Sequence, residues 1–95
     1  MPPDTRPTYT VLLKRDPERI MRRLPADLRR RIQQAINALA DDPRHAGVVA
    51  VKGLSSAYRV RVGDWRIIYQ VEDDVLIVLV LEVAPRGEVY RKLGR

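Results

Sequence analysis

The stretch from Tyr58 to Tyr69, YRVRVGDWRIIY, decides the fold because it has the pattern of a β-hairpin. Apolar and basic residues alternate up to Gly63, and a period of two is typical of a strand with one buried face. Gly63 and Asp64 form a turn pair, and glycine at the first central position favours a type II′ turn. The sequence therefore predicts two antiparallel strands joined by a two-residue turn.

The two-residue turn also predicts which side chains face each other across the hairpin. Val62 is expected opposite Trp65, and Arg61 opposite Arg66. One face of the hairpin then belongs to the core and carries Tyr58, Val60, Val62, Trp65, Ile67 and Tyr69. The other face carries Arg59, Arg61 and Arg66. Like charges placed directly across a ladder destabilise a sheet, so the pattern predicts an anion between these arginines.

The composition places the hairpin in a small basic domain. The 95 residues suit a single domain with one modest core, which we assign to residues 1–95 with a flexible lead-in at 1–7. Lysine and arginine total 18 against 12 aspartates and glutamates, and the formal charge of +6 favours phosphate-bearing or acidic partners. Cysteine is absent, which excludes disulfides and cysteine-based metal sites.

No stretch of the sequence suits a membrane or export. The longest apolar run, Val75 to Leu81, is far too short to cross a bilayer. Met1-Pro2-Pro3 does not open a signal sequence, because no charged region precedes an apolar stretch. We therefore expect a cytoplasmic protein without membrane contact.

The remaining elements predict an α+β class. A first strand is expected at 9–13, a helix starting at Asp16-Pro17, and a second helix over 25–40. Residues 75–81 are almost wholly apolar, which suits a central strand covered on much of both faces. The order predicts a curved antiparallel sheet of about four strands with both helices packed on one face (β-α-α-β-β-β). The arginine face of the hairpin is expected to stay open.

Few residues suit covalent or metal chemistry. His45 is the only histidine, and the acidic pairs at 41–42 and 73–74 fall at turns, where carboxylates commonly bond the backbone. No Ser-His-Asp or Cys-His set exists, and no cofactor or metal is expected. Arginines and tyrosines remain, and they suit RNA cleavage by attack of the ribose 2′-OH on the adjacent phosphate. Tyr90 is the candidate base or a platform for base stacking.

The hairpin, the apolar strand after it and the later VAPRGEVYR (residues 83–91) together resemble the RelE/ParE superfamily of toxins from type II toxin–antitoxin modules. The resemblance spans nearly the whole chain, and its parts are fairly specific in combination. Toxins of the RelE branch bind the ribosome and cut mRNA in the decoding site. The resemblance therefore implies a RelE-like fold and a ribosome-dependent mRNA endoribonuclease that inhibits translation. It also implies a cognate antitoxin, bound in a heterotetramer or a higher complex.

The resemblance also assigns site residues. The catalytic positions of the family correspond to Arg59, Arg61, Arg66, Arg86 and Tyr90. In the best-known RelE branch the first two are lysines, and arginine serves badly as a proton acceptor because its pKa is about 12 or above. Many relatives carry a histidine just before the late arginine, whereas this chain has Pro85. A histidine base is therefore absent.

Other basic residues are candidates for contacts with RNA phosphates of the ribosome: Lys52, Arg22, Arg23, Arg29 and Arg30. They could equally be solvated surface charges. The hairpin arginines themselves could form an ordinary solvated face or a docking surface for an acidic partner. Two further functions stay open: a non-enzymatic ParE-like toxin that binds DNA gyrase, and a degenerate member that only binds its antitoxin.

Overall fold

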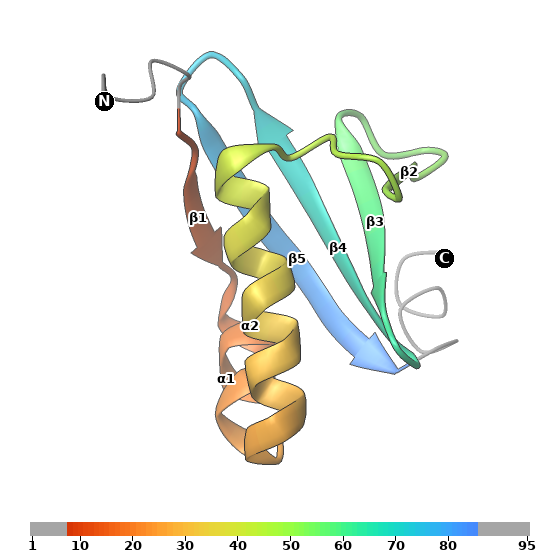
Figure 1. Cartoon of the computed structure of the whole chain (residues 1–95). Helices are drawn as coiled ribbons and strands as arrows, with labels where there is room; N and C mark the ends of the chain where they lie inside the picture. Colours follow the sequence, from red (N-terminus) through yellow and green to blue (C-terminus); the bar gives the residue numbers. More distant parts are fainter. Residues whose placement is uncertain (1–7, 86–95) are drawn as a thin grey trace, which may run out of the picture.

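The computed structural model describes residues 8–85, which form five strands and two helices. In chain order these are β1 (Thr10–Leu13), α1 (Arg15–Arg23), α2 (Ala26–Asp41), β2 (Val49–Ala50), β3 (Ala57–Val62), β4 (Trp65–Glu72) and β5 (Ile77–Pro85). The strands form one sheet in the spatial order β1-β5-β4-β3-β2. α2 lies along one face of the sheet, and α1 packs against β5 and the end of β1 (Figure 1). The predicted α+β class is confirmed, and the lead-in at 1–7 lies outside the described residues.

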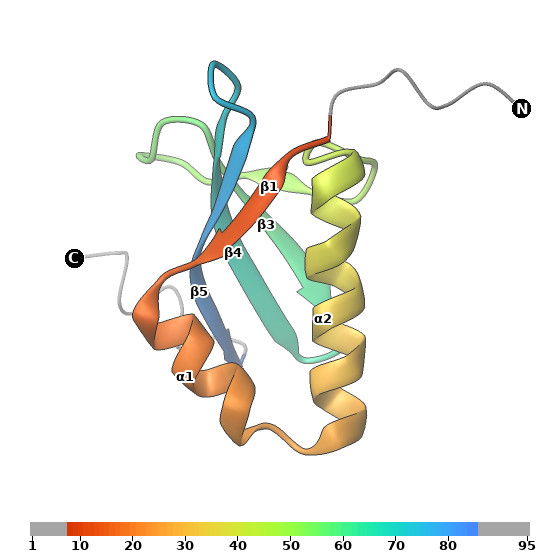
Figure 2. The same ribbon diagram turned by 90° about the vertical axis from the view of Figure 1, so that its left-hand side faces the viewer.

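The sheet is mixed rather than purely antiparallel. Strands β2 to β5 form an antiparallel meander, whereas β1 pairs with β5 in parallel, with Thr10 opposite Ile77. Parallel neighbours need a long connection, which the helices and the meander supply together. The two helices carry the chain across the sheet to β2 at the far edge, so the meander returns to β1 from the other side (Figures 1 and 2). The two-residue strand β2 is the fifth strand, beyond the four or so expected.

The helices begin and end close to the predicted positions. α1 begins one residue before Asp16, with Lys14 at the N-cap, so Asp16 lies in the first turn instead of capping the helix. Its carboxylate is favourable there because the N-terminus of a helix carries partial positive charge. α2 ends at Asp41, directly before Asp42-Pro43, because the residue that precedes a proline is disfavoured in the α conformation.

The apolar segment at 75–81 enters the sheet two residues later than predicted. Residues 73–76 form a turn in which Leu76 has a φ of 54° and Val75 is 62% exposed, so β5 begins only at Ile77. The strand then runs on to Pro85 between β1 and β4. Its predicted central position in the sheet is confirmed.

One main hydrophobic core lies between the helices and the sheet. Ile32, Ile36 and Leu39 of α2 are buried, and they belong to the same cluster as Ile67 and Tyr69 of β4. The apolar face of the hairpin is therefore confirmed as one wall of the core. No helix in the described part of the chain is long and apolar enough to cross a membrane.

Candidate functional site

The hairpin has the register that its turn predicts. β3 and β4 pair with Arg61 opposite Arg66, and the other rungs follow as expected. Gly63 has a φ of 59° and Asp64 a negative φ, the pattern of a type II′ turn. A Cβ atom on Gly63 would lie 3.0 Å from Nη2 of Arg31, so a guanidinium from α2 reaches the tip of the hairpin. The sequence alone does not single out Arg31 from its neighbours on the helix.

The hairpin arginines lie on the face of the sheet opposite the main core, because the residues that alternate with them belong to that core. Arg61 is exposed, whereas Arg59 and Arg66 are half-buried and each already take part in an interaction within the chain. Arg61 makes no ion pair with any of residues 8–85. Its nearest rung partner is Arg66, a like charge, which is unfavourable unless an anion lies nearby.

This face is less open than predicted, because an apolar cluster lies within it. Ile68, which pairs with Arg59 across the ladder, is fully buried. Ala84 is 5% exposed, and Val51 and Leu81 pack against these two residues. The surface formed by Arg59, Arg61, Arg66, Ile68, Ala84 and Glu82 is called the arginine face below. Its guanidinium groups suit an anionic ligand such as a phosphate, whereas Ile68 and Ala84 are too buried to contact a ligand.

A β-bulge adds the carboxylate of Glu82 to the arginine face. Ile68 pairs with Glu82 but its neighbour Tyr69 pairs with Val80, so Leu81 is an extra residue in β5. Without the bulge, the alternation of a strand would point Glu82 into the core beside Val80. The bulge instead brings Glu82 next to Ile68, where it is 9% exposed. Bulges commonly re-aim a side chain beside functional sites, and no local signal in the sequence marks this one.

The other predicted basic residues do not join the hairpin arginines. Four of them lie exposed on the helices, which form the other layer of the molecule (Figure 2): Arg22, Arg23, Arg29 and Arg30. Arg22 pairs with Glu18 at 2.8 Å and Arg30 with Asp27 at 3.4 Å. Arg29 and Arg30 also line a hollow along α2. They form a separate basic surface.

Three further predicted residues lie in a loop or outside the described range. Lys52 is exposed in the loop between β2 and β3, before the strand that carries Arg59 and Arg61. Arg86 and Tyr90 lie outside residues 8–85. Their placement beside the hairpin therefore stays a prediction.

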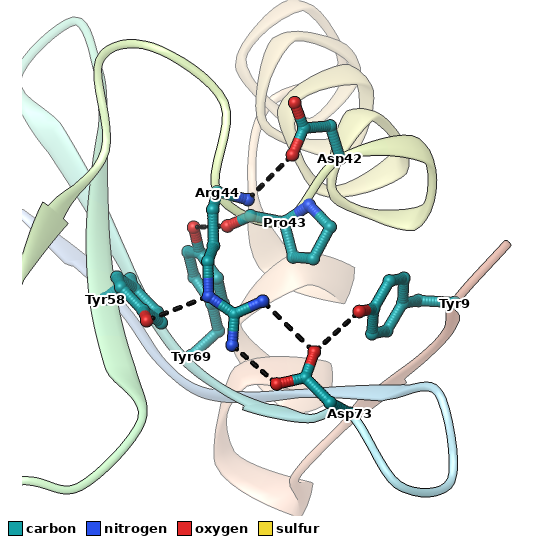
Figure 3. Close-up of polar contacts among 7 residues, drawn as sticks. All are labelled: Tyr9, Asp42, Pro43, Arg44, Tyr58, Tyr69 and Asp73. Carbon is teal, nitrogen blue, oxygen red and sulfur yellow. Dashed lines mark hydrogen bonds and ion pairs between the residues drawn. The ribbon is translucent and has the colours of Figure 1, made fainter. Parts of the chain in front are cut away.

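Arg44 joins four segments at the end of the sheet that holds the β4–β5 turn. Figure 3 shows its contacts. Its Nη1 and Nη2 donate hydrogen bonds to the two carboxylate oxygens of Asp73 at 3.1 and 2.8 Å. Its Nε donates to the hydroxyl oxygen of Tyr58 at 2.9 Å, and the Tyr9 hydroxyl donates to Asp73 at 2.6 Å. This Arg44 clamp ties the start of β1, the loop after α2, the strand β3 and the β4–β5 turn together. Sequence reasoning treated residues 73–74 only as a turn and missed the clamp.

The hydrogen bonds of the clamp shift the pKa values of Asp73, Tyr9 and Arg44. Hydrogen bonds from Arg44 and Tyr9 lower the pKa of Asp73 from 3.8 to about 2. The same carboxylate raises the pKa of Tyr9 and the pKa of Arg44. Tyr69 lies beside the clamp, and its buried hydroxyl donates a hydrogen bond to the carbonyl oxygen of Pro43 at 2.5 Å. Burial raises the pKa of Tyr69 above its usual value of 10. The clamp therefore stabilises the ionised form of Asp73 in the folded protein.

The arginine face offers charge stabilisation and hydrogen bonding. It combines guanidinium groups with one largely buried carboxylate, that of Glu82. Among residues 8–85, no group of three or more histidine, cysteine or acidic side chains is arranged to hold a metal ion. Guanidinium groups gathered on one sheet face suit the binding of phosphate oxygens.

Known proteins share both the sequence pattern and the fold. Residues 8–90 match the family model described as the ParE toxin of the type II toxin–antitoxin system parDE. The toxin RelG of Mycobacterium tuberculosis is 26% identical over 84 residues, which are 88% of this chain and 93% of RelG. In the RelE–RelB complex of Pyrococcus horikoshii, a chain with 29% identity superposes with a TM-score of 0.73 over 85% of this chain and 98% of its own. The isolated RelE toxin of E. coli, 22% identical, shares the fold with a TM-score of 0.73 over 90% and 95% of the two chains.

A helical pair on a mixed sheet with a basic hairpin is thus the RelE-like toxin fold. The chain belongs to the ParE toxin family, within the RelE/ParE superfamily of type II toxin–antitoxin toxins. The membership of the RelE/ParE superfamily that the sequence predicts is thereby confirmed.

Proposed function

We propose that this toxin is an mRNA endoribonuclease that acts on the ribosome and stops translation. The observation that supports this most is the rung in which Arg61 faces Arg66, beside Arg59. Two guanidinium groups in one rung are unfavourable without an anion between them. A phosphodiester of the message would be that anion, since arginine pairs well with phosphate oxygens.

The chemistry needs little more than geometry and charge. The 2′-oxygen of a ribose would attack the adjacent phosphorus, forming a 2′,3′-cyclic phosphate and releasing the 5′-oxygen of the next nucleotide. Arg59, Arg61 and Arg66 would hold the phosphate in line and offset the charge of the phosphorane. Following the family resemblance, Tyr90 would position the 2′-OH or take its proton, and Arg86 would assist the leaving oxygen.

The proposed partners are an antitoxin and the ribosome. The P. horikoshii relative is part of a RelE–RelB complex, and by analogy a cognate antitoxin would hold this toxin in check. The exposed arginines on α1 and α2, together with Lys52, would contact RNA phosphates of the ribosome. These contacts would add affinity for the ribosome without taking part in cleavage, because they lie apart from the hairpin arginines.

A second function follows from the name of the matched family. The family model is that of ParE, and a ParE-like toxin would bind DNA gyrase without cleaving RNA. Such a toxin has no need of two arginines that face each other in one rung of the sheet. The arginine face therefore favours the ribonuclease over the gyrase inhibitor.

Two assays on the purified full chain separate the two functions. In a cell-free translation extract, we expect the reporter message to be cut only while it is translated. In a gyrase assay, we expect supercoiling to proceed unchanged. The Arg86→Ala, Tyr90→Phe double variant should fold normally and leave the message intact. Supercoiling that stops while the translated message stays whole would replace this proposal with the gyrase function.

A further inference from the structure

β1 forms one edge of the sheet, and none of residues 8–85 pairs with its outer side. Figure 2 views the molecule from this side, with β1 facing the reader. The N–H groups of Thr10 and Lys14 point inward and donate to carbonyl oxygens at 2.8 and 3.0 Å. Because backbone groups alternate in direction along a strand, the N–H and C=O groups of Val11 and Leu13 point outward. The edge can therefore form hydrogen bonds with a further strand.

The sequence does little to protect this edge. At the opposite edge, β2 has only two residues, a length that gives a further strand little to pair with. β1 has four residues, TVLL, without the charges, prolines or glycines that commonly block an exposed edge. Leu12 is 46% exposed on the face opposite the main core, in register with the half-buried Leu79 of β5. The edge thus combines unpaired backbone groups with an exposed apolar strip.

We propose that two copies of this chain pair through β1, antiparallel, about a two-fold axis at Leu12. Val11 of each copy would face Leu13 of the other, so that the outward groups of both copies form hydrogen bonds. Leu12 would face its own counterpart in a non-hydrogen-bonded pair, in which the side chains lie closest. Leu79 and Leu12 of the two copies would then form one apolar strip. The two five-stranded sheets would join into one, with both arginine faces on the same side.

The charges at the two ends of β1 favour this antiparallel arrangement. Lys14 and Arg15 are exposed at the end of the strand and make no ion pair with any of residues 8–85. The start of the strand lies beside the acidic β4–β5 turn, because the hydroxyl of Tyr9 donates to Asp73. Antiparallel pairing would bring the basic end of each strand to the acidic end of the other. Parallel pairing would place the two basic ends together.

The C-terminus of α2 adds negative charge at the same place. The N–H group of Tyr9 donates to the carbonyl oxygen of Ala40 at 2.8 Å, so α2 ends beside the start of β1. The last turn of α2 holds no basic residue, and the helix ends at Asp41. The C-terminus of a helix carries partial negative charge and is stabilised by nearby cations. Lys14 and Arg15 of the second copy would supply those cations.

Cross-linking of single-cysteine variants of the full chain tests the contact and its register, since the chain has no cysteine of its own. Leu12→Cys should form an intermolecular disulfide on mild oxidation, because Cα atoms about 4.5 Å apart suit a disulfide. Thr10→Cys and Lys14→Cys should cross-link with each other when mixed, and neither should do so alone. Val49→Cys is the matched control, 49% exposed on the opposite edge, and should remain uncross-linked.

Sedimentation equilibrium of the unaltered full chain measures the association itself. The average mass should rise from one chain towards two as the protein concentration increases, because a small interface gives a weak dimer. Leu12→Lys should weaken this association about tenfold, since two like charges would then face each other at the axis. Val49→Lys should leave the association unchanged. Circular dichroism of each variant shows whether it is folded.

Three results would overturn the proposal. A mass of one chain at every concentration would show that the edge does not pair with a second copy. Association without cross-linking of Leu12→Cys, or with equal cross-linking of Val49→Cys, would place the contact elsewhere on the molecule. Cross-linking of Leu12→Cys without any between Thr10→Cys and Lys14→Cys would exclude the antiparallel register.

Discussion

Arg61 and Arg66 face each other in one rung of the β3–β4 ladder, on a sheet face that also holds Arg59. The apolar side of the same strands supplies the core. Arg66 takes part in an interaction within the chain, whereas Arg61 makes no ion pair with any of residues 8–85. Like charges in this position reduce the stability of a sheet. We therefore expect the arginines of this face to bind a ligand and to lower the stability of the free protein.

The first prediction concerns the stability of the free protein. Arg61→Gln should leave the free energy of unfolding unchanged or raise it by up to about 0.5 kcal/mol, because a like-charge rung disappears. Urea denaturation measures the change. Arg29→Gln, an exposed position on α2, is the matched control and should have no effect beyond about 0.5 kcal/mol. A loss of more than about 1 kcal/mol in Arg61→Gln would mean that this arginine supports the fold.

The second prediction concerns salt. If Arg61 binds an RNA phosphate, removing it should reduce the slope of log affinity against log salt concentration by about 0.7, the contribution of one contact to a single strand. A titration of a 2′-O-methyl RNA oligonucleotide at several salt concentrations measures this slope. Arg29→Gln should leave the slope for a short oligonucleotide unchanged, because Arg29 lies on the helical layer. An unchanged slope in Arg61→Gln would contradict a phosphate contact.

The third prediction concerns the tip of the hairpin. Gly63→Ala should lower the free energy of unfolding by about 1 to 2 kcal/mol, because alanine is strained at a φ of 59°. The new Cβ would also meet Arg31, but only at the mobile end of a long side chain. The same substitution in an Arg31→Ala background should therefore cost nearly as much in urea denaturation. If the cost disappears in that background, the side-chain contact rather than the backbone is its cause.

The fourth prediction concerns pH. The pKa of Asp73 is lowered from 3.8 to about 2 by its hydrogen bonds to Arg44 and Tyr9. The ionised carboxylate therefore stabilises the fold fully above about pH 4, and this contribution is lost as the pH falls towards 2. Thermal unfolding followed by circular dichroism between pH 6 and pH 2 should show a steeper loss in the unaltered protein than in Asp73→Asn.

Asp74→Asn provides the control for the pH experiment. Asp74 is the exposed neighbour in the same turn and makes no ion pair with any of residues 8–85. The Asp74→Asn variant should lose stability between pH 6 and pH 2 as steeply as the unaltered protein does. Parallel curves for Asp73→Asn and the unaltered protein would show that the Arg44 clamp does not contribute to stability.

The hairpin could be predicted in detail because its signals are local. The alternation along Tyr58 to Val62 and the glycine at the turn fix both the register and the faces, and the structure has that register. The helices were predicted to within two residues for the same reason, since prolines and the apolar stripe mark them. Such features need no knowledge of distant contacts.

Other features depend on residues far apart in the chain. Arg44 and Asp73 are 29 residues apart, and no local sequence pattern at either position predicts that they form an ion pair. The parallel pairing of β1 with β5 depends on the path of the whole chain across the sheet. The bulge at Leu81, which sends Glu82 to the arginine face, arises from the pairing of β5 with β4. Sequence patterns do not contain these relationships.

The most direct measurement is primer extension on a reporter mRNA in cells during tight induction of the toxin. The unaltered protein should produce cuts within translated codons, and Arg61→Gln with Arg66→Gln should remove those cuts while the protein remains folded. Asp74→Asn, which alters an exposed position in the β4–β5 turn instead, should retain them. Growth arrest with an intact message, or unchanged cuts in the hairpin variant, would contradict an RNA-cleaving role for the arginine face.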